Sequence, residues 1–467
     1  MRYDILHHNF PIMLDKICLA HTDIYKSLSF IFLGGKRVKG YARTRIFIMI
    51  LASLALIVAG CSNKAVEEHK TEDTNITLKV FWWGSEDRQK RTEAVIKLFE
   101  EQHPEIKIEG STVPLSGYWD QLAMKAADQD FPDVLQMDYS MIADYSIRKL
   151  LEPLDAFVEK GTINLSDVDS VYVDPGKINN ALYGISLGVN APALIYDPKV
   201  FQQTGIKGPG PEITYDQLIE TGKQLKAELG EDFYPLDAET LDFSYYIRQK
   251  GATLFSTDGK ALGYENDQDL TDFFTLQKTL VNEGIMAFSG SKEEKDSLIV
   301  KGDSAFSPIT SNRVILYSQL KGRTIRMMPL PLLQGGEEGN YLKPSQFFST
   351  SSYSKHKEAA AEFINFFTND TAANEILQGE RGVPIAGKIR KLLSEQANDS
   401  GKEQYDYIEY VASHNKPIDP PPPRGASKVN NLLLRLGKQV NDGLKTPEAA
   451  SQQFRKEATA TLAEMNS

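Results

Sequence analysis

The chain has 467 residues, of which 41% are hydrophobic and 25% are charged, a balance typical of globular proteins with two or three domains. Its net charge of −11 is unevenly distributed, because residues 1–60 hold eight Lys and Arg against three Asp and Glu, whereas the remainder holds 44 against 60. An acidic body argues against nucleic-acid binding, which requires a basic face. Both cysteines, Cys18 and Cys61, lie near the N-terminus, so disulfide and thiolate chemistry are not expected in the rest of the chain.

The N-terminal region has the layout of an export signal. Residues 46–60 form an uncharged, mostly apolar run, and five Lys and Arg residues lie between Lys36 and Arg45. A basic stretch, a short apolar core and small residues are typical of a secretory signal peptide. The run of 15 residues is short for a membrane-spanning helix, which needs about 20. We therefore predict that residues 1–60 are a signal peptide.

The end of this signal resembles the lipobox of bacterial lipoproteins, in the sequence Val-Ala-Gly-Cys that ends at Cys61. The resemblance implies cleavage before Cys61, lipidation of its sulfur and a membrane anchor at the N-terminus. An ordinary signal peptide with an accidental cysteine is the alternative. Residues 61–74 are polar and predict a flexible tether. Residues 1–37 do not fit an export signal, and we hypothesise that they are untranslated and that translation starts at Val38.

The first part of the mature chain alternates between strand and helix patterns. Residues 78–83 are rich in strand-forming residues, and Ser85 can cap a helix that ends near His103. A second strand follows at 106–109, then a helix near 118–128 and a third strand at 133–137. This order predicts a parallel α/β sheet, with ligands bound beyond the carboxyl ends of the strands.

The second part begins with two extended segments and continues with helices. Residues 181–186 and 189–196 both favour strands, with Gly188 and Pro192 where the chain can pass between domains. Helical patterns dominate from about 214 to 283, and a last helix is expected at Pro447.

Four stretches of the mature chain resemble family 1 extracellular solute-binding proteins, which serve carbohydrate ABC importers. They occur in the family's order at 78–104, at 131–138 followed by 150–158, at 181–201 and at 343–370. The resemblance implies a periplasmic-binding-protein-like α/β fold, in which two lobes joined by a multi-strand hinge close on a ligand. It places lobe 1 at 75–189 plus 325–369 and lobe 2 at 190–324 plus 370–467.

The resemblance also implies a function and its partners. We expect a lipid-anchored, monomeric receptor on the outer face of the cell membrane, which delivers a mono- or oligosaccharide to the transmembrane subunits of an ABC permease. No cofactor, metal or nucleic acid is expected, and the chain lacks a phosphate-binding loop for ATP.

Sugar sites combine aromatic rings, which stack on the C–H faces of the sugar, with polar groups that pair with its hydroxyls. In lobe 1, at most one of two adjacent tryptophans is expected to face the ligand, because strand side chains alternate. Core packing, turns and helix caps are the alternative roles for every candidate. The candidates are Trp82, Trp83, Tyr118, Trp119, Asp138, Tyr139, Asn190, Tyr245, Tyr246, Phe306, Ser307, Asn312 and Arg381. Arg313, Arg381 and Lys343 could pair with a uronate carboxylate, and solvated surface charge is the alternative role for each.

The main rival function is that of a secreted carbohydrate-active hydrolase. Residues 184–188 fit the Gly-x-Ser-x-Gly pattern of a nucleophile elbow, but that motif requires a following helix, whereas residues 189–196 favour a strand. A receptor for a non-sugar solute such as a peptide and a surface adhesin remain as further alternatives.

Overall fold

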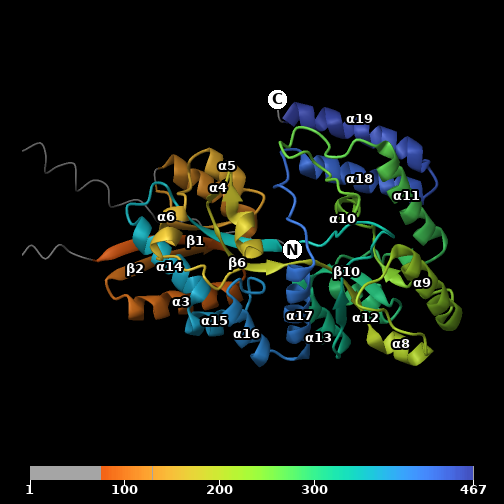
Figure 1. Ribbon diagram of the computed structural model, residues 1–467, viewed down its shortest axis with the longest axis horizontal. Helices are drawn as coiled ribbons and strands as arrows, with labels where there is room; N and C mark the ends of the chain where they lie inside the picture. Colours follow the sequence, from red (N-terminus) through yellow and green to blue (C-terminus); the bar gives the residue numbers. More distant parts are fainter. Residues whose placement is uncertain (1–74, 129, 466–467) are drawn as a thin grey trace, which may run out of the picture. The chain divides into compact units, whose positions relative to one another are not determined.

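The computed structural model describes residues 75–128 and 130–465. The predicted signal peptide, Cys61 and the tether therefore lie outside the described residues. The described residues form two five-stranded β-sheets and one two-stranded sheet. Figure 1 shows the two larger sheets, each surrounded by helices. Among the described helices, none combines the length and the apolar character needed to cross a membrane.

The first sheet has the strand order β2-β1-β3-β12-β6. Strand β1 pairs in parallel with β2 and β3, whereas β12 pairs antiparallel with both β3 and β6. Strands β1, β3 and β6 therefore run in the same direction. The strands are β1 (Ile76–Trp83), β2 (Ile106–Val113), β3 (Val134–Met137), β6 (Ile185–Asn190) and β12 (Lys343–Thr350).

Helices cover both faces of this sheet (Figure 1). Helices α3 and α14 pack on one face and α4 on the other, so the two neighbouring tryptophans of β1 point into different clusters. The helices are α3 (Glu86–Gln102), α4 (Leu115–Ala127), α5 (Ile142–Ile147), α6 (Asp155–Lys160), α7 (Ser170–Val173), α14 (Lys357–Asn369), α15 (Thr371–Leu377) and α16 (Gly387–Gln396), with a small hairpin of β4 (Lys177–Ile178) and β5 (Ala181–Leu182).

The local signals of this part of the sequence are confirmed. The Ser85 side chain accepts a hydrogen bond from the backbone N–H of Arg88 and so caps α3, whose first turn holds two acidic residues. The same helix ends at Gln102, where the backbone N–H of His103 closes the last turn. The predicted strand–helix–strand–helix–strand order is therefore present from β1 to β3.

The second sheet has the order β11-β7-β10-β8-β9. Strand β10 is parallel to β8 and antiparallel to β7, which places Pro192 of β7 opposite Thr310 of β10. Its strands are β7 (Pro192–Tyr196), β8 (Leu236–Asp237), β9 (Met286–Ala287), β10 (Phe306–Thr310) and β11 (Arg326–Met328). The accompanying helices are α8 (Pro198–Thr204), α9 (Tyr215–Leu229), α10 (Phe243–Arg248), α11 (Asp267–Asn282), α12 (Leu298–Lys301), α13 (Val314–Lys321), α17 (Asp399–Ser413), α18 (Ala426–Asn441) and α19 (Pro447–Met465).

Two of the expected lobe boundaries differ from the structure. The chain was expected to leave lobe 2 near 324, but β11 still pairs with β7 of the second sheet, so the crossing lies between Met328 and Lys343. The chain was also expected to return near 370. Instead α15 packs against α3, and Arg91 of α3 donates to the carbonyl oxygen of Ile376 at 2.8 Å. The first lobe therefore continues beyond the end of α14 and includes α15, because α15 packs against α3.

A buried ion cluster fixes the chain where β7 ends. Asp197 is fully buried, accepts a 3.0 Å hydrogen bond from Nε of Arg323, and has the Lys321 ammonium at 3.2 Å. Burial raises the pKa of this carboxyl, but the hydrogen bond from Arg323, the backbone N–H of Lys199 and the Lys321 charge outweigh burial and hold the pKa below its usual value.

Replacing Asp197 with alanine is therefore expected to lower the free energy of unfolding by about 3 kcal/mol at pH 7, because two cations lose their buried partner. A depressed pKa stabilises the fold above the unfolded pKa, near pH 4, and this contribution is lost as the pH falls through the folded pKa. Urea denaturation between pH 7 and pH 3 measures both effects. Asp174→Ala, which removes an exposed ion pair with Lys177, is the control and should cost at most about 1 kcal/mol. Equal losses in the two variants would contradict the prediction.

Candidate functional site

The strand ends of the two sheets meet where the chain passes from one sheet to the other. Strand β6 ends at Asn190, opposite Lys343 of β12, and β7 starts two residues later at Pro192. The side chain of Ser311 accepts a 3.0 Å hydrogen bond from the backbone N–H of Ala191, and its own N–H donates to the Ala191 carbonyl at 2.9 Å. The crossing segment is thus held against the end of β10.

A cavity of about 440 Å³ lies at this junction, and it is referred to here as the polar chamber. Its lining comes from residues 191–192 between the sheets, from the end of β10 and the start of α13, from the loop before α10, and from residues 292–294. The segment between β11 and β12 and the first residue of β12 complete it. Its volume is in the range of small-molecule sites. The lining residues are Ala191, Pro192, Asp242, Lys292, Glu294, Pro308, Ile309, Thr310, Arg313, Tyr317, Leu330, Tyr341 and Lys343.

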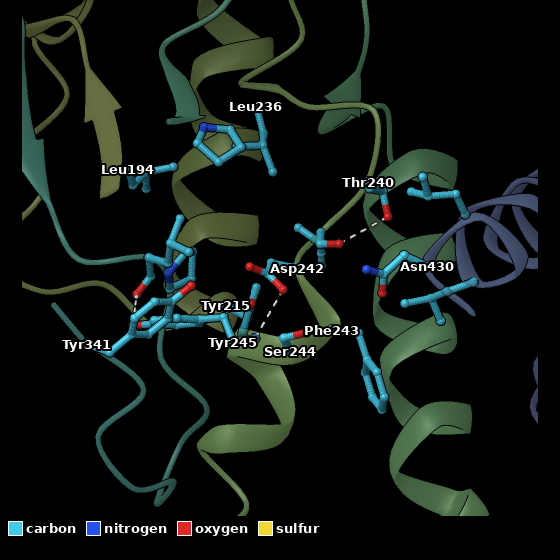
Figure 2. A pocket seen from close by; sticks show the side chains of 16 residues that line it. Leu194, Tyr215, Leu236, Thr240, Asp242, Phe243, Ser244, Tyr245, Tyr341 and Asn430 are labelled. Carbon is cyan, nitrogen blue, oxygen red and sulfur yellow. Dashed lines mark hydrogen bonds between the residues drawn. The ribbon is translucent and has the colours of Figure 1, made fainter. Parts of the chain in front are cut away.

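Asp242 is one of the hydrogen-bond acceptors that line this chamber. It caps α10 by accepting a 3.1 Å hydrogen bond from the backbone N–H of Tyr245, while its side chain remains exposed to solvent. The surrounding walls reduce the hydration of the carboxylate and raise its pKa, and the backbone N–H groups of Tyr245 and Ser244 and the charge of Arg248 oppose this rise. Figure 2 shows the carboxylate among the side chains that line the neighbouring cavity.

Arg248 organises the segments beside the chamber. Its buried guanidinium donates to the carbonyl oxygens of Gly339 at 3.0 Å and Pro417 at 3.0 Å, and it forms an ion pair with Asp419. The same group lies 4.9 Å from the ring centroid of Tyr341. One side chain therefore links α10 to the segment between β11 and β12, which carries Tyr341, and to the chain that follows α17.

Tyr139 connects this assembly to the first lobe. It follows β3, is 8% exposed, and donates a 2.7 Å hydrogen bond to the carbonyl oxygen of Asp419. Its burial raises its pKa, as does the nearby Asp419 charge, whereas Arg248 lowers it. A second cavity of about 320 Å³ lies between Tyr139, the hairpin region near Lys177 and the proline-rich chain at 415–421.

The predicted residues of the first lobe are mostly packed into its core. Trp82 is 1% exposed and packs near Gly110, whereas Trp83 is 8% exposed and lies 4.8 Å from Tyr118 between ring centroids. Tyr118 is fully buried and donates to the carbonyl of Gln136 at 2.7 Å. Trp119 is only partly buried, with its ring centroid 5.7 Å from that of Trp83, and is more exposed than either strand tryptophan.

Asp138 and Asn190 lie at the strand ends, as expected. The Asp138 carboxylate accepts from the backbone N–H of Ser140 at 2.8 Å, so it shapes the turn after β3. The Asn190 side-chain oxygen is buried and has no hydrogen-bond partner among the described residues. Of these two side chains, Asn190 has the free acceptor nearest the crossing point.

The predicted residues of the second lobe divide in a similar way. Phe306 and Tyr246 are buried among other aromatic rings, at 5.6 Å from Phe201 and 5.3 Å from Phe273 respectively. Ser307 is 4% exposed and donates to the carbonyl of Asp237 at 3.1 Å.

Two further candidates of this lobe lie near the cavities. Asn312 is exposed on the turn before α13 and is absent from the lining of the polar chamber, whereas Arg313, its neighbour, lines it and pairs with Glu294. Tyr245 lines the cavity of Figure 2, and its hydroxyl donates to Asn340 at 3.0 Å.

Arg381 is a structural residue of the first lobe in this arrangement. It is 3% exposed, donates to Thr92 at 2.8 Å and to Gln136 at 3.3 Å, and pairs with Glu380. Its burial lowers its pKa to about 9, an effect that Arg88 reinforces and Glu380 opposes. The guanidinium is therefore already occupied by protein groups.

The hydrolase motif does not form a nucleophile elbow. Ser186 lies within strand β6, is 2% exposed, and donates to the carbonyl of Gly188 at 2.9 Å. The next element is strand β7 rather than a helix. Among the described residues, no group of three or more His, Cys, Asp and Glu side chains is placed to hold a metal ion.

Comparison with known proteins places the chain in a family. The family model for bacterial extracellular solute-binding proteins matches residues 83–374. An extracellular solute-binding protein family 1 from Alicyclobacillus acidocaldarius is 27% identical and superposes with a TM-score of 0.75 over 83% of this chain and 99% of that chain.

Two relatives have names that specify a ligand. The multiple sugar-binding protein of Streptococcus mutans is 21% identical over 361 residues, covering 73% of this chain and 81% of the relative. A periplasmic oligogalacturonide-binding protein from Yersinia enterocolitica shares the fold, with 22% identity and a TM-score of 0.72 over 84% of this chain and all of that one. The chain belongs to the bacterial extracellular solute-binding protein family, with the two-sheet periplasmic-binding-protein fold of ABC importer receptors.

Proposed function

We propose that this protein is a non-catalytic receptor that binds a sugar or oligosaccharide in the polar chamber and delivers it to an ABC permease. We further propose that the receptor is tethered to the outer face of the membrane through lipid on Cys61. Names of relatives that specify sugars support the ligand class. The observation that carries the proposal is the position of Asp242 and Tyr341 together in the chamber at the junction of the sheets.

These two groups suit the two surfaces of a sugar. A carboxylate accepts hydrogen bonds from hydroxyls in fixed geometry, and a tyrosine ring can cover the C–H face. Contacts from groups of both lobes, such as Asp242 and Lys343, would favour closure of the lobes around the ligand. The closed form is the state that we expect to dock on the permease.

A sugar panel tests the proposal. The melting temperature of the purified protein is recorded with neutral and uronic mono- and oligosaccharides, and with peptides as the comparison. A ligand at 100 times its Kd stabilises the native state by about 2.7 kcal/mol, which raises the melting temperature by several degrees. A shift with peptides and none with any sugar would contradict the sugar assignment, and hydrolysis of the bound sugar would contradict the non-catalytic assignment.

A further inference from the structure

A third cavity, of about 440 Å³, adjoins the polar chamber and differs from it in character. Figure 2 shows the side chains that line this third cavity. It is called here the apolar chamber. The two chambers share Asp242, Pro308, Leu330 and Tyr341, so a ligand held by the carboxylate borders both.

Leucines, prolines and a phenylalanine make up much of the wall of the apolar chamber. Leu194, Leu236 and Leu241 are at most 9% exposed and line it from the second sheet and the loop that follows β8. Leu433 and Leu434 of α18 line it from the other side, as part of the helix that bears Asn430 in Figure 2.

Two polar groups of this chamber are already engaged by protein. The Thr240 hydroxyl is 2.6 Å from the side-chain oxygen of Gln277, and the Tyr245 hydroxyl is bonded to Asn340. A sugar ring that filled the chamber would turn hydroxyls toward leucine side chains that cannot bond them, at a cost of hydration. An apolar group would lose no hydrogen bonds there and would gain from the burial of its surface.

Leu434 adds an independent observation. This side chain lines the chamber and yet is 46% exposed, so an apolar surface faces solvent at the binding cavity. An apolar group bound in the chamber would cover it.

We propose that the apolar chamber is a subsite for an apolar substituent, aryl or acyl, carried by the saccharide whose ring binds at Asp242. The proposal rests on the proposed sugar-binding function. It narrows the ligand class from plain sugars to glycosides or sugar esters, in which one part of the molecule has hydroxyls and another part has none.

The test compares methyl and phenyl glycosides of whichever sugar stabilises the protein, by isothermal titration calorimetry. Burial of the phenyl ring should make the phenyl glycoside bind at least tenfold more tightly. Leu434→Gln should reduce this advantage several-fold, whereas Leu444→Gln should not. Leu444 is the matched control because it is an even more exposed leucine, at 73%, and lies outside the chamber. Equal affinity of the two glycosides would overturn the proposal.

Phenol as a probe separates the two proposals. If no sugar binds, the proposed function fails, and phenol binding by NMR shift then decides on the chamber alone. Phenol binding that Leu434→Gln weakens and Leu444→Gln leaves intact supports an apolar subsite. No binding of phenol by the unaltered protein would overturn the subsite as well.

Discussion

Replacing Arg381 with alanine is expected to lower the free energy of unfolding by about 3 kcal/mol, because the substitution empties a buried position whose charge is paired and hydrogen-bonded. The loss leaves Gln136 and Thr92 without their bonds from the guanidinium and removes the cation that lies 5.2 Å from the ring centroid of Phe367. Glu380 keeps its 2.8 Å pair with Arg88, which limits the damage. Urea denaturation at pH 7 measures the change.

The control for this prediction is Arg435→Ala. Arg435 forms a 3.1 Å pair with Glu457, and both side chains are about half exposed, so its removal should cost less than about 1 kcal/mol. The experiment also separates two roles of Arg381. If Arg381 is a structural residue, its substitution lowers the stability of the free protein. If it is a ligand-binding residue, the substitution leaves that stability intact and weakens sugar binding alone. The latter result would contradict the structural role.

Replacing Asp242 with asparagine is expected to weaken sugar binding at pH 7 by about tenfold or more, the usual effect of losing a hydrogen bond to a charged group. Asparagine caps helices as well as aspartate does, so α10 should keep its first turn. The raised pKa means that the fold disfavours the carboxylate form, and the neutral side chain removes this cost. The melting temperature of the free variant should therefore equal or exceed that of the unaltered protein.

The pH dependence provides a second measurement for Asp242. Because its pKa is raised, the carboxylate should protonate at a higher pH than an ordinary aspartate, which titrates near pH 4. Sugar affinity should therefore fall, as the pH is lowered, before ordinary aspartates titrate. Asp242→Asn should show a flatter profile. Asp258→Asn, at an exposed turn where the carboxylate accepts from Lys260 N–H, is the control and should bind sugar normally. Normal affinity of Asp242→Asn at pH 7 would contradict the role of Asp242.

The sequence was a good guide to the local elements and to the family. The capping serine at Ser85, the periodic helix after it and the proline at Pro447 are signals that act over a few residues, and the structure has helices at these places. The extended segments around 181–196 were also predicted, because strands are recognisable from their composition. The positions of β11 and α15 were not predictable in this way, since pairing and packing across the chain decide which sheet they join.

The candidate site was harder to predict, because burial cannot be read from residue type. Tyr118, Phe306 and Arg381 have side chains that could bind a sugar, but each is buried and makes its contacts within a lobe. Asp242 was missed although it stands before an aromatic helix, a position that looks like an ordinary cap. Tyr341 has no local signal at all, because a contact with Arg248, 93 positions earlier, holds it at the chamber.

The position of β12 also has a consequence for the folding of the chain during its synthesis. This strand lies between β3 and β6, so the first sheet remains in two pieces until Lys343–Thr350 has been synthesised. A ribosome must therefore finish about three quarters of the chain before the sheet can close, and pairings at such long range form slowly. A nascent chain that completes its first sheet late keeps strand edges unpaired for longer, a delay compatible with a family whose members are extracellular.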